Sequence, residues 1–134
     1  AADAVAEARL VLAATAAELD RIPADFPESV PPPPTVQTMV EMERRLERLL
    51  ARRRGDWQPP SPRADAAEAL LLRELYTEWL RRPETLRRPA DFLQWARDGE
   101  RDGLALEAQL GANNTAEASR TLSRIAAGCG SCHT

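Results

Sequence analysis

The stretch Asn114–His133, with the sequence NTAEASRTLSRIAAGCGSCH, holds the clearest structural pattern in the chain. Its apolar side chains recur at intervals of three and four residues, which is the spacing of one face of an α-helix. Asn114 is a residue type that favours the N-cap position, and Glu117 follows it at the spacing of a capping box. We therefore predict a helix from about residue 114 to Cys132, with an apolar face formed by Ala118, Leu122, Ile125, Cys129 and Cys132.

The end of this helix and the residue after it hold all the cysteine and histidine of the chain, in the order Cys129-Gly130-Ser131-Cys132-His133. Helix positions i, i+3 and i+4 share a face, so both sulfurs and the imidazole are expected to face one flat ligand. Two thiols can add to the vinyl groups of haem as thioethers, and the neighbouring imidazole then ligates the iron. Cys-x-x-Cys-His is the attachment pattern of c-type haem. The motif predicts one covalent haem c on Cys129, Cys132 and His133, with His133 as the metal ligand.

Other uses of the two cysteines fit the sequence less well. A redox dithiol usually opens a helix in a βαβ unit, whereas this pair closes a helix in a chain with no strand pattern. A structural zinc ion needs four ligands, and the chain has two Cys and one His. A disulfide between such close neighbours would restrain little of the chain.

Prolines divide the rest of the chain into helical stretches. They cluster in residues 23–34 and 59–62 and recur at Pro83 and Pro89, and proline ends or interrupts a helix. Between them we predict helices over about 3–22, 35–54, 65–82 and 90–110. In the third of these, the predicted apolar stripe is Leu70, Leu71, Leu75, Trp79 and Leu80.

The composition supports an all-α fold. Hydrophobic residues make up 43% of the chain and aromatic residues 4%, and the hydrophobic ones are mostly Ala and Leu, which are strong helix formers. Alternating β-branched stretches are nearly absent. We predict a single domain, residues 1–134, that is a four-helix bundle with haem attached near the C-terminus of its last helix.

Several function classes are disfavoured. The net charge is −3, so a nucleic-acid partner is not expected. No apolar run approaches the roughly 20 residues that a membrane span needs. No nucleophile motif, phosphate loop or distinctive carboxylate pair points to an enzyme. The arginines of residues 44–54 offer a docking surface for an acidic partner, but we favour a solvated face with Glu43 and Glu47 as i,i+4 partners.

The sixth position on the iron decides between two functions. The chain has one histidine, which excludes bis-histidine ligation within one chain. The remaining candidates are Met39, Met42 or no protein ligand. A methionine on the apolar face of a helix is more often packed in the core than bound to a metal, and we favour packing here.

The chain resembles the cytochrome c-prime family, the class II c-type cytochromes. Four segments carry the resemblance: residues 4–22 look like the family's first helix, residues 46–57 like the end of the second helix and a loop tryptophan, Glu78-Trp79 like the residues before the third helix, and residues 114–133 like the last helix with its haem motif. The family usually continues after the histidine with an aromatic residue and an arginine, whereas this chain stops at Thr134.

The resemblance implies a four-helix bundle with a five-coordinate haem. It places Leu12 on the distal side of the haem and Trp57 near the haem. Leu12 would then block large ligands and admit small gases such as nitric oxide or carbon monoxide. The alternative is a six-coordinate, Met-ligated cytochrome that carries electrons, because methionine ligation raises the reduction potential.

The same resemblance sets the expected surroundings of the protein. C-type haem is attached outside the bacterial cytoplasm, so a periplasmic protein is expected, and the small residues at the N-terminus, Ala1-Ala2-Asp3, look like the product of signal-peptide cleavage. The expected partner is a redox protein or a small gas. A homodimer is possible through the first helix, near Val11 and Leu12.

Overall fold

The computed structural model describes residues 15–19, 21 and 31–132. The chain divides into two compact units, Ala1–Pro31 and Pro32–Thr134. The described part of the first unit contains the short helix α2 (Ala16–Leu19), in which Glu18 accepts hydrogen bonds from the backbone nitrogen and the hydroxyl of Thr15, at 2.8 and 2.7 Å. Most of the helix predicted over 3–22 lies outside the described residues.

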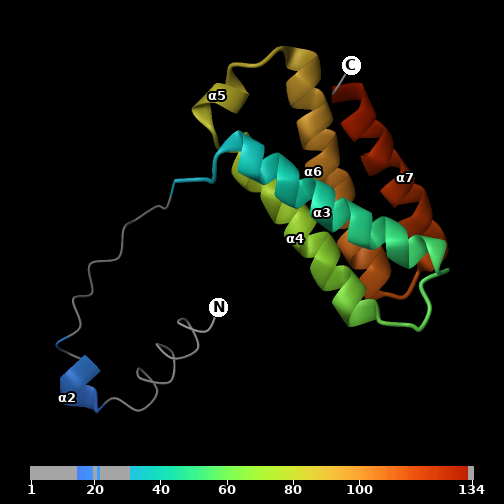
Figure 1. Cartoon of the computed structure of the whole chain (residues 1–134), viewed down its shortest axis with the longest axis horizontal. Helices are drawn as coiled ribbons and strands as arrows, with labels where there is room; N and C mark the ends of the chain where they lie inside the picture. The colour runs from blue at the N-terminus through green and yellow to red at the C-terminus, as the bar shows by residue number, and fades with distance from the viewer. Residues whose placement is uncertain (1–14, 20, 22–30, 133–134) are drawn as a thin grey trace. The chain divides into compact units, whose positions relative to one another are not determined.

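Four main helices pack together in the second unit (Figure 1). They are α3 (Thr35–Arg54), α4 (Pro62–Leu80), α6 (Ala90–Gly111) and α7 (Thr115–Cys132), and the short helix α5 (Pro83–Leu86) lies between α4 and α6 in the chain. No strand occurs in the described residues. The predicted all-α fold with four packed helices is confirmed, and its four helices all come from residues after Pro34.

The helices begin and end close to the prolines and glycines that the sequence places between them. α3 begins directly after Pro34 and ends before Gly55, with three arginines in its last turn that complement the helix dipole. α4 has Pro62 in its first turn, a position that proline favours. At the start of α7, Asn114 accepts a long hydrogen bond from the backbone nitrogen of Glu117, at 3.4 Å, which confirms the predicted N-cap.

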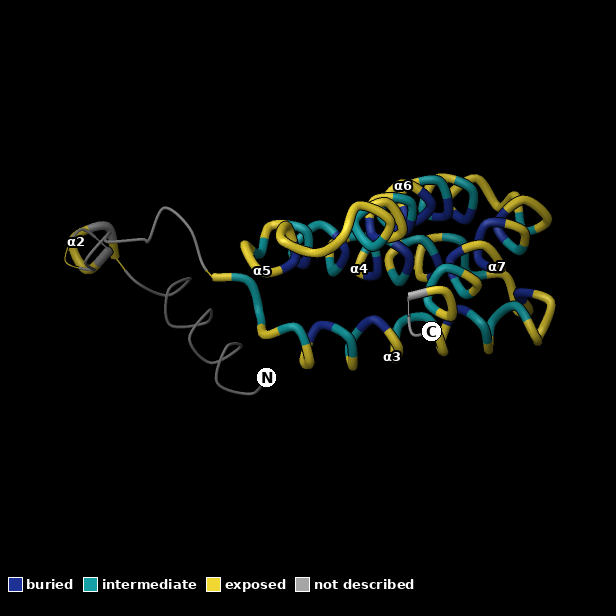
Figure 2. The backbone as a smooth tube through the Cα atoms, turned by 90° about the horizontal axis from the view of Figure 1, so that it is seen from above, coloured by how far each residue is buried: buried dark blue, intermediate teal, exposed yellow. Residues whose placement is uncertain are grey.

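The helices bury one stripe each toward a common core (Figure 2). α4 packs most extensively against α6, and then α6 against α7 and α3 against α4, whereas α3 and α7 touch only sparsely. The end of α3 meets the first half of α7, where Arg53 donates a 2.6 Å hydrogen bond to Ser123. The core consists of Met42, Leu49, Trp57, Ala69, Leu72, Tyr76, Trp79, Ala96, Leu106, Leu110, Ala118, Leu122 and Ile125.

The stripe predicted for residues 65–82 is confirmed only in part: Trp79 is buried, and Leu75 and Leu80 are partly buried against the core. The buried positions of α4 are Asp65, Ala69, Leu72, Tyr76 and Trp79, of which the sequence analysis named one. Leu71 is exposed instead. The hydrophobic run Leu70–Leu72 surrounds much of the helix, so spacing alone does not select a face. The ion pair of Asp65 with Arg52 offsets the free-energy cost of burying the carboxylate.

Candidate functional site

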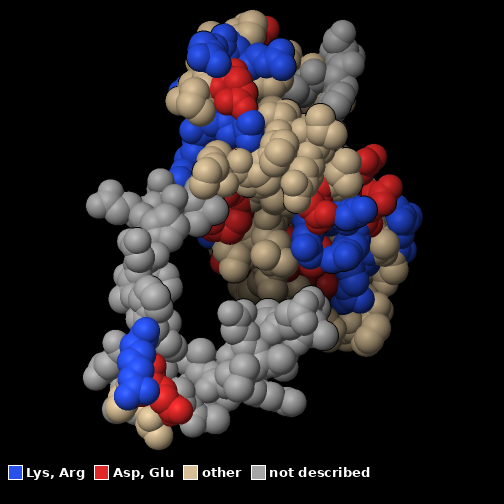
Figure 3. Space-filling model, turned by 60° about the vertical axis from the view of Figure 1, so that its left-hand side comes forward, with Lys and Arg blue, Asp and Glu red and all other residues tan. Residues whose placement is uncertain are grey.

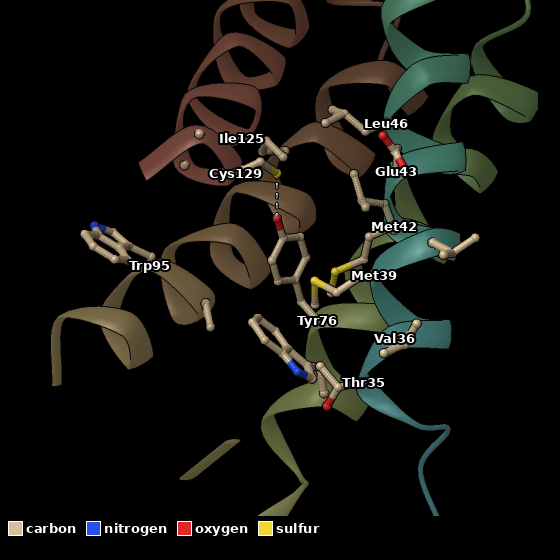
Figure 4. Close-up of a pocket in the computed structure, with 16 residues that line it drawn as sticks. Thr35, Val36, Met39, Met42, Glu43, Leu46, Tyr76, Trp95, Ile125 and Cys129 are labelled. Carbon is tan, nitrogen blue, oxygen red and sulfur yellow. Dashed lines mark hydrogen bonds between the residues drawn. The ribbon is translucent and has the colours of Figure 1, made fainter. Parts of the chain in front are cut away.

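A pocket of 610 Å³ opens at the end of the bundle where α3 begins and α7 ends (Figure 4). Its volume is typical of a cofactor site, which is usually about 300–1,000 Å³. All four main helices contribute to its wall. The part formed by α3 is mostly apolar: Val36, Met39, Val40, Met42 and Leu46, with Thr35 and Glu43 as polar members.

Cys129 is the part of the predicted haem motif that this pocket contains. Its side chain is half-buried and its thiol forms no disulfide within the described residues. The Cys129 Sγ lies 3.8 Å from the hydroxyl of Tyr76 on α4 (Figure 4). A free thiol therefore faces a largely apolar cavity from the last turns of α7.

The other residues of the motif are placed only in part. α7 runs through Cys132, so the backbone keeps the i, i+3 spacing between Cys129 and Cys132 that attachment on one face requires. The side chain of Cys132 and all of His133 lie outside the described residues, and so do Leu12 and Val11. The predicted distal residue and the predicted dimer contact stay predictions.

Trp57 is not brought to Cys129. Its side chain is 2% exposed in the core, and its indole nitrogen donates a 3.0 Å hydrogen bond to Ser119 Oγ in the first turns of α7. Ser119 and Cys129 are ten residues apart on one helix, which is about 15 Å. Asp56 and Trp57 adopt left-handed backbone conformations, with φ of 51° and 59°, and this turn directs the indole into the opposite end of the bundle.

Both methionines line the pocket (Figure 4). Met42 is 7% exposed and belongs to the core, and Met39 is partly buried against it. They are three residues apart on α3 and so share a face. The structure therefore brings together Cys129 and the two methionines that the sequence analysis had only as alternatives.

Tyr76, Trp79 and Trp95 are pocket residues that the sequence analysis did not assign to the site. Tyr76 and Trp79 continue the seven-residue spacing of Ala69 and Leu72 along α4, and this spacing was the available signal. Trp95 is 37% exposed at the wall contributed by α6. These residues can be assigned to the site only when it is known how α4 and α6 pack against α7.

An ion pair between α6 and α7 lies beside the pocket. Arg124 on α7 binds Asp102 on α6 through two hydrogen bonds of 3.1 and 3.0 Å, which raise the pKa of Arg124. This pair lines a second cavity of 210 Å³ that shares Tyr76 with the larger pocket. On the face of the molecule that Figure 3 shows, basic and acidic side chains of the described residues lie next to one another.

Gly99 on α6 makes room for the Tyr76 ring. A Cβ at Gly99 would lie 2.5 Å from Cε1 and Cζ of Tyr76, which is far inside van der Waals contact. We expect Gly99→Ala to lower the free energy of unfolding by about 1–3 kcal/mol, the usual cost of overpacking. Denaturant unfolding followed by circular dichroism measures this change.

Gly128 provides the matched control, because a Cβ there meets nothing within 4 Å. Alanine is favoured over glycine inside a helix by about 0.8–1.0 kcal/mol, so Gly128→Ala is expected to be neutral or stabilising. Equal stability of the two variants would show that Tyr76 does not depend on the space at Gly99.

The described residues contain no cluster of three His, Cys, Asp or Glu side chains that would hold a metal ion by itself. Among the same residues no helix is both long enough and apolar enough to cross a membrane. No protein-family model, curated protein or solved structure matches the chain in the corresponding comparisons.

Proposed function

We propose that the chain is a monohaem c-type cytochrome whose haem occupies the pocket beside Cys129. One observation carries the proposal: the first cysteine of the Cys-x-x-Cys-His motif opens into a 610 Å³, mostly apolar pocket that also contains two methionines. Cys129 and Cys132 would hold the haem as thioethers, and His133 would ligate the iron.

The residues around Cys129 fit a large flat group. Gly128 and Gly130 flank the cysteine and line the pocket, and a Cβ at either glycine would meet nothing within 4 Å. On both sides of the thiol, α7 therefore has no side chain that would obstruct a ligand. α3 and α7 touch only sparsely, which leaves space between these two helices at the end where the pocket lies.

Electron transfer with a methionine ligand is the function that the geometry supports best. When bound, haem supplies an iron that cycles between the ferric and ferrous states. Met39 and Met42 extend from α3 into the pocket (Figure 4), and a thioether there offers the soft ligand that raises a haem reduction potential.

This arrangement also modifies what the family resemblance implies. The resemblance to cytochromes c-prime placed the first helix at residues 4–22 and the distal position at Leu12. The second unit by itself contains four packed helices, of which α3 is the first. With α3 in the place of the family's first helix, methionines occupy the face where Leu12 had been expected.

A five-coordinate haem that binds nitric oxide or carbon monoxide is the second candidate. The observation in its favour is the burial of Met42, which is 7% exposed and packed in the core. A packed methionine has little freedom to reach a ligand position. In either case we propose a non-enzymatic protein located in the periplasm, where c-type haem is attached, with a redox protein or a small gas as its partner.

Haem attachment is the test of the proposal. We expect the chain, expressed in a bacterium that attaches c-type haem in its periplasm, to gain the mass of one haem. The spectrum in alkaline pyridine should be that of a haem with two thioethers. Cys129→Ser and Cys132→Ser should each give the red-shifted spectrum of a haem with one thioether, and the double variant should carry no covalent haem.

Ser131→Ala is the matched control, since it changes the motif between the cysteines without removing a sulfur, and it should attach haem as the natural sequence does. An unmodified polypeptide, produced in cells that attach haem to a known c-type cytochrome in parallel, would refute the proposal.

A further inference from the structure

The end of the pocket where α3 begins is rich in hydrogen-bond donors. Figure 4 places Thr35 and Val36 at this end, and Cys129 and Ile125 at the other. The α3 side chains that line the pocket extend from Thr35 to Leu46, a length of about 16 Å at 1.5 Å per residue. The pocket therefore joins two chemically different regions along α3.

Trp79 contributes a buried donor without an acceptor. It lines the pocket and is 6% exposed, and its Nε1 has no hydrogen-bond partner in the described part of the chain. Phe92 packs against the indole edge to face, with ring centroids 5.2 Å apart and an interplanar angle of 69°. Tryptophan Nε1 groups usually find an acceptor when they are buried, so an acceptor is missing here.

The first turn of α3 adds backbone donors to the same end. The N–H groups of the first residues of a helix have no partner within the helix. α3 is 20 residues long, its N-cap is Pro34, and no side chain caps it. Uncapped N–H groups together with the positive end of the helix dipole favour an anion.

Arg82 brings a positive charge close to this turn. Its Nη1 donates a 3.0 Å hydrogen bond to the carbonyl oxygen of Pro32 and another to that of Pro33, just before α3 begins. Its Nη2 pairs with Glu84, and its Nε is buried without a partner in the described residues. Trp79 and Arg82 are three residues apart, so both buried side-chain donors that lack a partner in the described residues come from one region of the chain.

We infer that Trp79 and the first turn of α3 form a carboxylate site, and that it binds a propionate of the haem. This inference rests on the proposed function. Haem carries its vinyl groups and its propionates on opposite sides of the macrocycle. Because thioether attachment would hold the vinyl side at Cys129, the propionates would extend toward the far end of the pocket. Glu43 lines the wall toward the Cys129 end (Figure 4), where its carboxylate would repel a propionate.

Labelled propionates test the inference in the haem-bearing protein. Cells fed 5-aminolevulinic acid with ¹³C in its carboxyl group produce haem labelled at the propionate carboxyls. In the ferrous carbon monoxide complex, which is diamagnetic, Trp79→Phe is expected to shift one propionate signal and leave the other in place. The ferric-to-ferrous equilibrium of the protein without carbon monoxide should move toward the ferric state by a factor of roughly three to ten, because a donor to the carboxylate is lost.

Trp95→Phe is the matched control, since Trp95 lines the same pocket but is 37% exposed; both propionate signals should stay in place. A second measurement uses the unchanged sequence and is independent of how well a variant folds: the indole proton of Trp79 should show a nuclear Overhauser effect to the methylene protons of one propionate. Absence of that effect, or equal shifts in the two variants, would overturn the inference. Absence of covalent haem, seen first by mass, would instead refute the proposed function.

Discussion

Replacing Arg52 with methionine is expected to lower the free energy of unfolding by about 2–4 kcal/mol, somewhat below the 3–5 kcal/mol range for breaking a fully buried ion pair. Arg52 on α3 makes hydrogen bonds of 2.7 and 2.9 Å to Asp65 on α4. The Asp65 side chain is 8% exposed, so removal of Arg52 leaves a buried carboxylate without its partner. The hydrogen bond with Asp65 raises the pKa of Arg52, which keeps the guanidinium charged.

The effect is expected to be large because the same guanidinium also holds the loop between α3 and α4. It donates to the carbonyl oxygens of Trp57, Gln58 and Pro59, at 3.0, 2.8 and 2.8 Å. Asp56 and Trp57 have positive φ in this loop, a conformation that costs about 1–3 kcal/mol for residues other than glycine and needs support from its surroundings. Arg52 supplies part of that support.

Denaturant unfolding of Arg52→Met and Arg48→Met, compared in the same haem state, checks this prediction. Arg48 also bridges α3 to α4, through a 3.2 Å contact with Glu68, but its side chain is 60% exposed. Exposed pairs contribute about 0–1 kcal/mol, so Arg48→Met should change stability little. Arg52→Lys keeps the positive charge but loses the planar, two-pronged guanidinium. Its free energy of unfolding should lie between those of Arg52→Met and Arg48→Met. If Arg52→Met and Arg48→Met are equally stable, Arg52 does not organise the loop.

Helix positions were largely predictable because the chain is punctuated by residues with strong local preferences. The prediction of a helix over 35–54 coincides with α3, and that over 90–110 falls one residue short of the end of α6. Proline and the N-cap Asn114 act through the backbone of their immediate neighbours, so their effect can be read without knowing the tertiary structure.

The ion pairs of the α3 arginines could not be predicted from local sequence preferences. The sequence predicted a solvated face with Glu43 and Glu47 as partners, because only neighbours on the same helix are visible in a sequence. In the structure Arg45 and Arg48 contact Glu68, and Arg52 contacts Asp65, both on α4. The prediction of i,i+4 partners is therefore wrong for these three arginines. No arginine stands four residues from Glu43 or Glu47, and the rotation of α4 about its own axis decides which carboxylates face α3.

The candidate site likewise contains residues that the sequence alone identifies and residues that only the packing of the helices reveals. Cys129 is a chemically specific residue in a specific motif, and the sequence alone singles it out. Tyr76 and Trp79 reach the pocket through the packing of α4, and the spacing of α4 was ambiguous because leucines surround the helix. Trp57 points to the other end of the core because of two left-handed residues, and neither of them is the glycine that would have indicated such a turn.

The sixth iron ligand is the feature whose replacement should change the haem most. In the haem-bearing protein, we expect one of the variants Met39→Leu and Met42→Leu to convert a low-spin ferric spectrum into a high-spin one. The reduction equilibrium of that variant should shift toward the ferric state by a factor on the order of a thousand, or about 180 mV at 59 mV per tenfold change, within the range that axial ligands cover.

Leucine suits this comparison because exchanging methionine and leucine in a core usually costs less than about 1.5 kcal/mol. Each variant therefore removes a sulfur while preserving most of the packing, and the methionine that does not ligate serves as the control for the one that does. Both residues line the pocket from the same face of α3, so a general disturbance of the pocket would affect the two variants alike. A high-spin spectrum in the unchanged protein, unaltered by either substitution, would instead establish an open iron and favour the gas-binding function, because then neither sulfur reaches the metal and both methionines act as core residues.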